Sequence, residues 1–326
     1  MHTMLEHQYT YMNHFKWGYN GSWFNKRENE RDVYMTKFGQ IERQPLSFKE
    51  ECYDVARKIF NYSIMKDTTV DLMFSGGSES EMMVRSFTEQ NLPINIHIMA
   101  FKDFKNIHDI SHAIAFCERN NLEYILHELD VEKLIIEKGL LYAQFSKCIT
   151  PRMLPHMWLM EQLKGGVVVM GMGECYISHK HVKQYYDYKD GRIIRNSKND
   201  YDKAPWYLYE REKINSWYRF AEHHDIMAIP GFFQYTPEIM LAFLEEQVTK
   251  ELVNCERFGK LSNTSTKLEV YEKHFPNLMQ RYKKDGFEML QHLDTELRPE
   301  LIKLYGQYSQ EYKIDYEDLI RKLRHG

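Results

Sequence analysis

The sequence predicts an α/β protein with a parallel, Rossmann-like sheet that carries helices on both faces, followed by a mainly helical C-terminal region. Short apolar runs alternate with amphipathic stretches between about residues 47 and 170, at the pitch of right-handed strand–helix–strand units. Two of the apolar runs end in glycine turns. In open sheets of this kind ligands bind beyond the carboxyl ends of the strands, where these turns fall.

Composition is that of an ordinary soluble protein. The 326 residues are 43% hydrophobic and 28% charged, enough for one large or two modest domains. The net charge of −4 and the scattered Lys and Arg provide no basic field for a long stretch of nucleic acid. Five cysteines without CxxC spacing indicate reduced thiols. With no apolar signal segment and no run of membrane-spanning length, we expect a cytoplasmic protein that binds no membrane.

The first 46 residues are predicted to form an N-terminal arm. They are rich in aromatic and charged residues without a sustained period, so we expect an extended or hairpin segment across the main domain. Ser47 and Glu50 have the spacing of a capping box, which opens a helix to about Asn61. The predicted nucleotide-binding α/β domain, residues 47–180, begins at this helix.

A strand, a glycine turn and a helix start follow in the stretch VDLMFSGGSESEMMVRSF, residues 70–87. Gly76 and Gly77 allow a tight turn and close approach to a ligand. The N–H groups of the helix start and the hydroxyls of Ser75, Ser78 and Ser80 suit phosphate oxygens. The stretch lacks a Walker A Lys and the GxGxxG spacing. The alternative is a tight strand-to-helix connection with no ligand.

The same alternation continues to residue 170. We predict strands at 94–101, 123–129 and 167–170 and helices at 109–120 and 150–164. The last strand, VVVM, is fully apolar and ends at Gly171-Met172-Gly173-Glu174, a second glycine turn. This turn can also be read as an ordinary strand end.

Beyond residue 178 the composition becomes polar. Residues 179–202 predict a long excursion, with a hairpin at Asp190-Gly191. The remaining helices are predicted at about 207–224, 236–252, 265–274, 285–293 and 310–324. Residues 181–326 would thus form a mainly helical region that completes the site.

The first glycine turn resembles the SGGxDS loop of the PP-loop ATP pyrophosphatases, with Glu79 in place of the family's Asp. Further stretches, in the right order from about residue 50 to 290, resemble the synthetase domain of asparagine synthetases and of β-lactam synthetase. They are Asp109 with Ala113, EYILHEL, ITPRMLPHMWLMEQLKGGVVVMGMGE, IPGFFQYTPEIMLAF and TKLEVYEKHFPNLMQRYKKDGF. The resemblance implies a fold like that of the HUP group, or adenine nucleotide α-hydrolases.

The resemblance also implies an ATP-dependent, AMP-forming ligase or transferase that adenylates a carboxylate or similar group for attack by an amine. Its implied nucleotide-binding residues are Ser75, Gly76, Gly77, Ser78, Glu79, Ser80, Gly171 and Gly173. Glu79 and Glu174 would bind Mg²⁺, while Lys283 and Lys267 would neutralise charge on departing pyrophosphate. ATP and an unidentified small-molecule acceptor are the expected partners.

Three departures from the family pattern weigh on this expectation. The second residue is not the glutaminase Cys, and the first 45 residues are too few for a glutaminase domain. Met172 replaces a Glu associated with the attacking nitrogen, and Glu174 precedes the family's Asp position, where Cys175 stands. ATP use is therefore better supported than amide formation. The alternatives are a sulfur- or tRNA/nucleobase-modifying PP-loop enzyme and a nucleotide-binding protein without catalysis.

Overall fold

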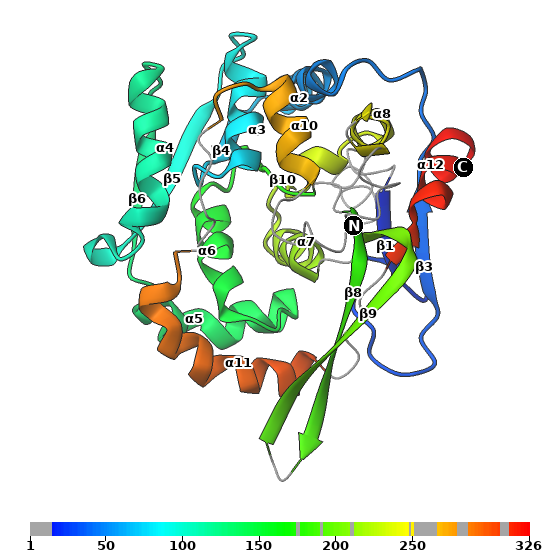
Figure 1. The fold of residues 1–326 in the computed structure, drawn as a ribbon. Helices are drawn as coiled ribbons and strands as arrows, with labels where there is room; N and C mark the ends of the chain where they lie inside the picture. Colours follow the sequence, from blue (N-terminus) through cyan, green and yellow to red (C-terminus); the bar gives the residue numbers. More distant parts are fainter. Residues whose placement is uncertain are drawn as a thin grey trace.

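The largest sheet among the described residues is parallel and lies in the upper left of Figure 1. The computed structural model describes residues 15–173, 177–189, 192–208, 212–247, 249–250, 266–278, 286–306 and 313–326. The five strands of the sheet have the order β10-β7-β4-β5-β6 and pair in parallel throughout. Their bounds are Val70–Met73 for β4, Asn95–Phe101 for β5, Ile125–Leu129 for β6, Val167–Met170 for β7 and Ala228–Ile229 for β10. The predicted α/β class with a Rossmann-like parallel sheet is confirmed.

The chain builds this sheet outward from β4 in two directions. It first runs through β5 to β6, then returns to place β7 on the other side of β4 and ends at β10. Because parallel crossovers are right-handed, the reversal puts the crossover helices of the two halves on opposite faces. Helices α3 (Ser78–Thr88) and α4 (Ile107–Arg119) cover one face, where Phe74 and Phe116 pack with ring centroids 5.5 Å apart. Helices α6 (Leu154–Gln162) and α7 (Glu212–His224) cover the other.

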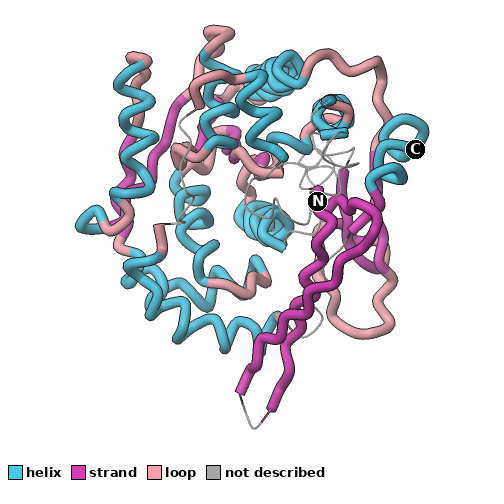
Figure 2. Tube along the Cα trace, in the orientation of Figure 1, coloured by secondary structure: helices cyan, strands magenta, loops and turns pink. Residues whose placement is uncertain are grey.

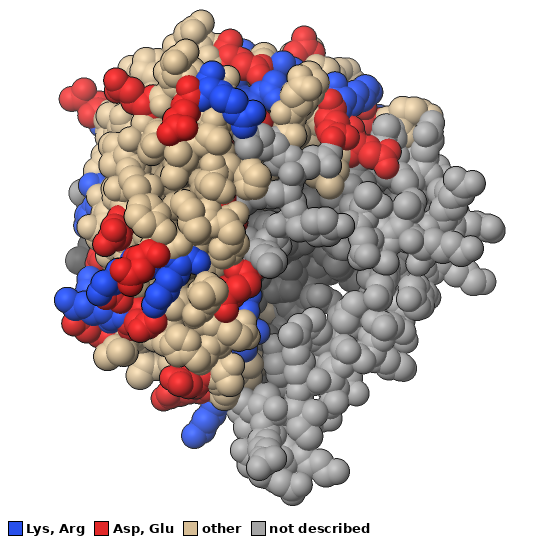
Figure 3. All heavy atoms as spheres, turned by 60° about the vertical axis from the view of Figure 1, so that its left-hand side comes forward, with Lys and Arg blue, Asp and Glu red and all other residues tan. Residues whose placement is uncertain are grey.

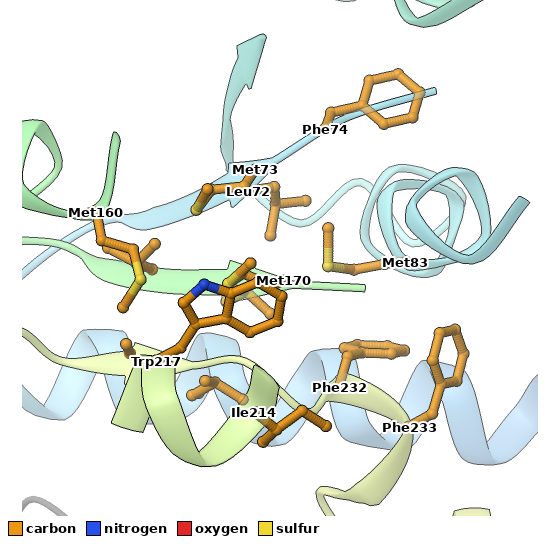
Figure 4. Close-up of a cluster of buried hydrophobic side chains, with 14 of the residues drawn as sticks. Leu72, Met73, Phe74, Met83, Met160, Met170, Ile214, Trp217, Phe232 and Phe233 are labelled. Atoms are coloured by element: carbon orange, nitrogen blue, oxygen red, sulfur yellow. The ribbon is translucent and has the colours of Figure 1, made fainter. Parts of the chain in front are cut away.

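Burial is most complete in the two central strands. Every residue of β4 and β7 is buried, as expected for strands covered on both faces. Figure 4 shows part of the surrounding core, in which Met73, Met83, Met160, Met170 and Trp217 come from five different elements. The ends of β4 and β7 are therefore held in place by the core.

The N-terminal residues 15–38 form a small antiparallel sheet. Strands β1 (Phe15–Tyr19), β2 (Ser22–Trp23) and β3 (Tyr34–Phe38) have the order β2-β1-β3. The predicted capping box is present, since Ser47 and Glu50 exchange hydrogen bonds at the start of α2 (Phe48–Met65). This helix continues past the predicted end at Asn61.

One helix was not predicted. Helix α5 spans Val131–Ser146, and the Asp130 side chain caps it by accepting a hydrogen bond from Lys133 N–H at 3.0 Å. Ile136, Leu140 and Leu141 of this helix are exposed, so apolar residues lie on more than its buried side. An amphipathic pattern is therefore weak in this stretch.

The C-terminal half contains more strand than predicted. The hairpin around residues 190–191 is confirmed, because β8 (Ile177–Lys189) pairs antiparallel with β9 (Arg192–Leu208), and Figure 2 shows it projecting from the body. β9 occupies residues predicted as the start of a helix, and β11 (Lys313–Asp315) pairs with its end. The helices of this half, besides α7, are α8 (Pro237–Leu244), α10 (Thr266–His274), α11 (Gln291–Tyr305) and α12 (Tyr316–His325).

The predicted helix at 285–293 was wrong in its bounds. Residues Glu288–Leu290 form a 3₁₀ turn, and α11 continues to Tyr305 with Pro299 inside it. Proline is unfavourable inside a helix, yet α11 continues past Pro299 and beyond the predicted end at residue 293. Among the described helices, none combines the length and apolar character needed to cross a membrane.

Candidate functional site

The two glycine turns leave the sheet side by side. Met73 and Met170 are paired at the ends of β4 and β7, so the loops that follow start next to each other. β4 and β7 are also the strands between which the chain reverses its direction of sheet building. In open α/β sheets this switch point is where ligands bind, outside the carboxyl ends of the strands.

The first loop is pressed against α4. Gly76 has a φ of +73°, which favours glycine, and a Cβ on it would lie 2.5 Å from the backbone nitrogen of Ala113. Any side chain at Gly76 would therefore collide with the backbone of α4. The close approach fixes where the loop turns and where α3 begins.

Serine hydroxyls close the same loop. Ser80 Oγ donates to the carbonyl oxygen of Gly77 at 3.0 Å, and Ser75 Oγ lies 3.1 Å from Ser80 Oγ. A hydroxyl has one hydrogen, which Ser80 gives to Gly77, so Ser75 is the donor in the serine pair. Ser75 Oγ in turn accepts from Gly77 N–H at 3.4 Å. Both ends of the loop are tied together by groups that can also bind phosphate oxygens.

The N-terminus of α3 points out of this loop. Gly77 occupies the N-cap position, and among the described residues no side chain caps the helix. The first turn of a helix carries unsatisfied N–H groups and the positive end of the helix dipole. This arrangement favours an anion at the end of the loop.

Glu79 places a carboxylate at the same helix end. Its side chain is only 6% exposed and accepts a hydrogen bond from Ser78 Oγ at 3.0 Å. A phosphate here would be repelled by this carboxylate unless a cation lay between them. Mg²⁺ typically takes one or two carboxylates and completes its shell with phosphate oxygens and water, so Glu79 fits such a site. The described residues contain no group of three or more His, Cys, Asp or Glu that would hold a metal without substrate.

The second loop packs directly on the first. A Cβ on Gly171 would lie 2.8 Å from Ser80 Cα and 2.9 Å from the carbonyl oxygen of Glu79. The end of β7 thus touches the first turn of α3. Gly173 has a φ of +87° and turns the chain away beside Gln234. Met172 is half-buried between the two glycines and packs against the core.

Three predicted site residues are not placed. Glu174 and Lys283 lie outside the described residues, and Lys267 belongs to α10 but its side chain is not among those described. Gly286 is three residues after Lys283 in the sequence, and a Cβ on Gly286 would lie 2.9 Å from Asn106 Cβ. The next residue, Phe287, meets Phe101 at the end of β5 with ring centroids 6.3 Å apart. The described chain thus resumes at the carboxyl edge of the sheet.

A buried polar chain was missed by the sequence analysis. Asp71 Oδ1 lies 2.9 Å from His97 Nε2, and His97 Nδ1 lies 2.9 Å from His127 Nε2. The three residues come from β4, β5 and β6 and cross the sheet on the α6 face, where His127 meets the Trp158 ring. Strands buried on both faces are usually apolar throughout, so a polar residue in each of three neighbouring strands was the available signal.

Burial and neighbouring groups shift the pKa values of Asp71 and His127. Burial alone would raise the pKa of Asp71, but hydrogen bonds from His97, Asn95 and Thr69 outweigh it and leave the pKa below its usual value. Burial is the larger cause that lowers the pKa of His127, and the neighbouring His97 lowers it further. Asp71 therefore stays ionised, and His127 is neutral at neutral pH.

The fold and the two loops define an α/β protein with a candidate phosphate-binding loop at the switch point of a parallel sheet. No family model matches the chain, and no curated protein matches it. Among solved structures, NMN synthetase from Francisella tularensis is similar at 13% identity and a TM-score of 0.32, covering 77% of this chain and 94% of that one. The NH3-dependent NAD synthetase from Campylobacter jejuni, solved with nitrate, is similar at 13% identity and a TM-score of 0.31, covering 81% and 99%. Likenesses at these values do not establish a shared activity.

Proposed function

We propose that the protein is an ATP-dependent ligase or transferase of the PP-loop type that forms AMP and pyrophosphate. The observation that carries the proposal is the contact of Gly171 with the backbone of Ser80 and Glu79. It brings the ends of two central strands together at the N-terminus of α3, where hydroxyls, backbone N–H groups and a carboxylate converge. Such a cluster suits a polyphosphate with a divalent cation.

In this proposal the first loop binds the β- and γ-phosphates of ATP. The hydroxyls of Ser75, Ser78 and Ser80 would turn from their partners within the loop and donate hydrogen bonds to the phosphates. The loop backbone and the helix dipole would stabilise the negative charge that grows on departing pyrophosphate. Glu79, together with Glu174, would hold Mg²⁺, which when bound supplies positive charge to the phosphates. Lys283 and Lys267 would add cationic charge as pyrophosphate leaves.

The reaction would proceed in two displacements. A carboxylate oxygen of the substrate bonds to the α-phosphorus as the bond from that phosphorus to pyrophosphate breaks. An amine nitrogen then bonds to the acyl carbon of the adenylate, AMP departs with the electrons of the acyl–oxygen bond, and the nitrogen loses a proton. The chain's part in both steps is positioning and electrostatic stabilisation.

A nucleotide-binding protein without catalysis is the second candidate. Met172 supports it, because a thioether between the two glycines of the second loop offers no acid or base to an attacking nitrogen. Nucleic-acid modification has less support, because acidic and basic side chains are interspersed over the described face in Figure 3 instead of forming a basic patch.

Two measurements on the full-length protein separate these candidates. ATP binding with and without Mg²⁺ is measured by calorimetry, and exchange of labelled pyrophosphate into ATP is measured with a panel of amino acids and dicarboxylic acids. Binding with carboxylate-dependent exchange supports the ligase, whereas binding without exchange under any condition supports the non-catalytic protein. The variant Ser78→Ala should weaken ATP binding, while Ser22→Ala, in β2, serves as a matched control. Failure of the wild type to bind ATP would reject both candidates.

A further inference from the structure

Asp71, His97 and His127 form a continuous hydrogen-bonded chain that the proposed mechanism does not use. Asp71 and His97 are 6% and 4% exposed, and His127 is half-buried at the outer end. The Asp71 carboxylate also accepts from Asn95 Nδ2 and Thr69 Oγ1, each at 2.9 Å. Three donors around one buried carboxylate are the environment of an ionised acid, consistent with its low pKa.

The carboxylate determines where the imidazole hydrogens lie. An ionised Asp71 can only accept, so His97 Nε2 carries the hydrogen in their 2.9 Å contact. In the state in which both imidazoles are neutral, His97 Nδ1 is bare and must accept from His127 Nε2. It follows that neutral His127 has a bare Nδ1, and within the described residues no group donates a hydrogen bond to this atom. The hydrogen-bonded series Asp71–His97–His127 thus ends in a proton acceptor, His127 Nδ1.

The same geometry limits the pair of histidines to one added proton. A proton arriving at His127 Nδ1 can be matched by transfer of the Nε2 hydrogen to His97 Nδ1, which places the positive charge beside Asp71. A second proton would leave hydrogens on both nitrogens of the 2.9 Å contact and two like charges side by side. Among the described residues, the titratable groups facing His127 are His97 from β5 and, through it, Asp71 from β4; α6 presents the Trp158 ring.

The outer end of this chain lies level with the start of the first loop. Phe74 N–H donates to the His97 carbonyl at 2.8 Å, so the β4 ladder ends beside His97 and the loop begins one residue later. His127 pairs with Met99, two residues further along β5 toward the carboxyl edge. β6 is two strands from β4, which places His127 about 10 Å from the loop start at a spacing of about 4.8 Å per strand.

We propose that Asp71, His97 and His127 form a proton relay in which His127 Nδ1 accepts the proton lost by the attacking amine. This inference rests on the proposed function, since it assigns a base to the second displacement. No heavy-atom bond changes in the relay: the amine proton bonds to Nδ1, and the Nε2 hydrogen moves to His97. A neutral His with a pKa below its usual value remains available as a base at neutral pH.

The hydrogen positions can be tested without any substrate. Nitrogen-15 NMR of the histidine-labelled full-length protein reports the tautomers, with His97→Gln and His127→Gln used for assignment. We expect both residues as Nε2–H tautomers at about pH 8, and one shared protonation between about pH 8 and pH 5. In Asp71→Asn this protonation should shift to lower pH, because the anion that stabilises the imidazolium is lost. A His127 with its hydrogen on Nδ1, or two independent protonations, would overturn the relay.

The catalytic role is tested by comparing the two displacements. His127→Gln should lower the rate of ammonium-dependent AMP formation by about 100-fold while leaving ATP–pyrophosphate exchange unchanged, because exchange requires no amine deprotonation. His325→Gln, an exposed residue at the end of α12, should alter neither rate. Equal slowing of both reactions, or of neither, would refute a role in the second displacement. Absence of exchange in the wild type would reject the proposed function and leave the NMR result to decide on the relay.

Discussion

The contact between Gly76 and α4 provides the sharpest test of the first loop. In Gly76→Ala the new Cβ would lie 2.5 Å from Ala113 N, and the residue would keep a φ of +73°. The backbone conformation costs about 1–2 kcal/mol for a residue with a Cβ, and the collision adds about 1–3 kcal/mol as α4 or the loop moves. We therefore expect Gly76→Ala to lower the free energy of unfolding by roughly 2–5 kcal/mol.

Gly21 offers a matched control in the turn between β1 and β2. It has a φ of +85°, but a Cβ on it would meet no atom within 4 Å. Gly21→Ala should therefore carry only the conformational cost of about 1–2 kcal/mol. The difference between the variants isolates the collision of Gly76 with α4.

Urea unfolding measures both free energies, and calorimetry measures ATP affinity in the same samples. Displacement of the loop should weaken ATP binding in Gly76→Ala, while Gly21→Ala should bind like the wild type. Equal unfolding midpoints for the two variants, with unchanged ATP affinity, would refute the packing argument and remove the first loop from the nucleotide site.

Three further predictions address other parts of the candidate site. Glu79→Ala should abolish Mg²⁺-dependent ATP turnover, and normal turnover would exclude Glu79 as the metal ligand. Lys283→Ala should lower kcat by about 100-fold or more, at about 1.4 kcal/mol of activation free energy per tenfold, with ATP affinity nearly intact. Lys284→Ala should have little effect on kcat. A normal rate of pyrophosphate release in Lys283→Ala would exclude a catalytic role for this residue. Gly166→Ala should lower the free energy of unfolding by roughly 2–4 kcal/mol, because a Cβ on Gly166 collides with the Asp71 carboxylate. Gly165 has a φ of +120° and open space around it, so Gly165→Ala should carry only the conformational cost of about 1–2 kcal/mol. Urea unfolding measures both values, and a wild-type midpoint for Gly166→Ala would contradict the collision.

Local signals explain the parts of the fold that were predicted. Ser47 and Glu50 satisfy the start of α2 within one turn, so the capping box is visible in four residues. The apolar run of β4 and the glycines after it likewise depend only on neighbouring residues. The hairpin at residues 190–191 follows from a turn signal between two stretches that pair with each other.

Helices held by distant contacts escaped this kind of prediction. Helix α5 has exposed Ile136 and Leu140, so its buried side cannot be recognised from apolar spacing alone. Helix α11 tolerates Pro299, and Asp294 near its start pairs with Arg298 and with Arg152 in a different segment. Tertiary contacts thus override the local preference at these positions.

The sequence by itself determined the chemistry of the first loop, because Ser75, Gly76 and Gly77 are adjacent in the chain. Only the tertiary structure decided what this loop touches. The contacts of Gly76 with Ala113 and of Gly171 with Ser80 depend on the strand order, which no local pattern encodes. The same holds for the relay: His97 and His127 are thirty residues apart, and they meet only because β5 and β6 pair in one register. A shift of that register by one residue would turn His127 to the opposite face of the sheet and break the proton relay.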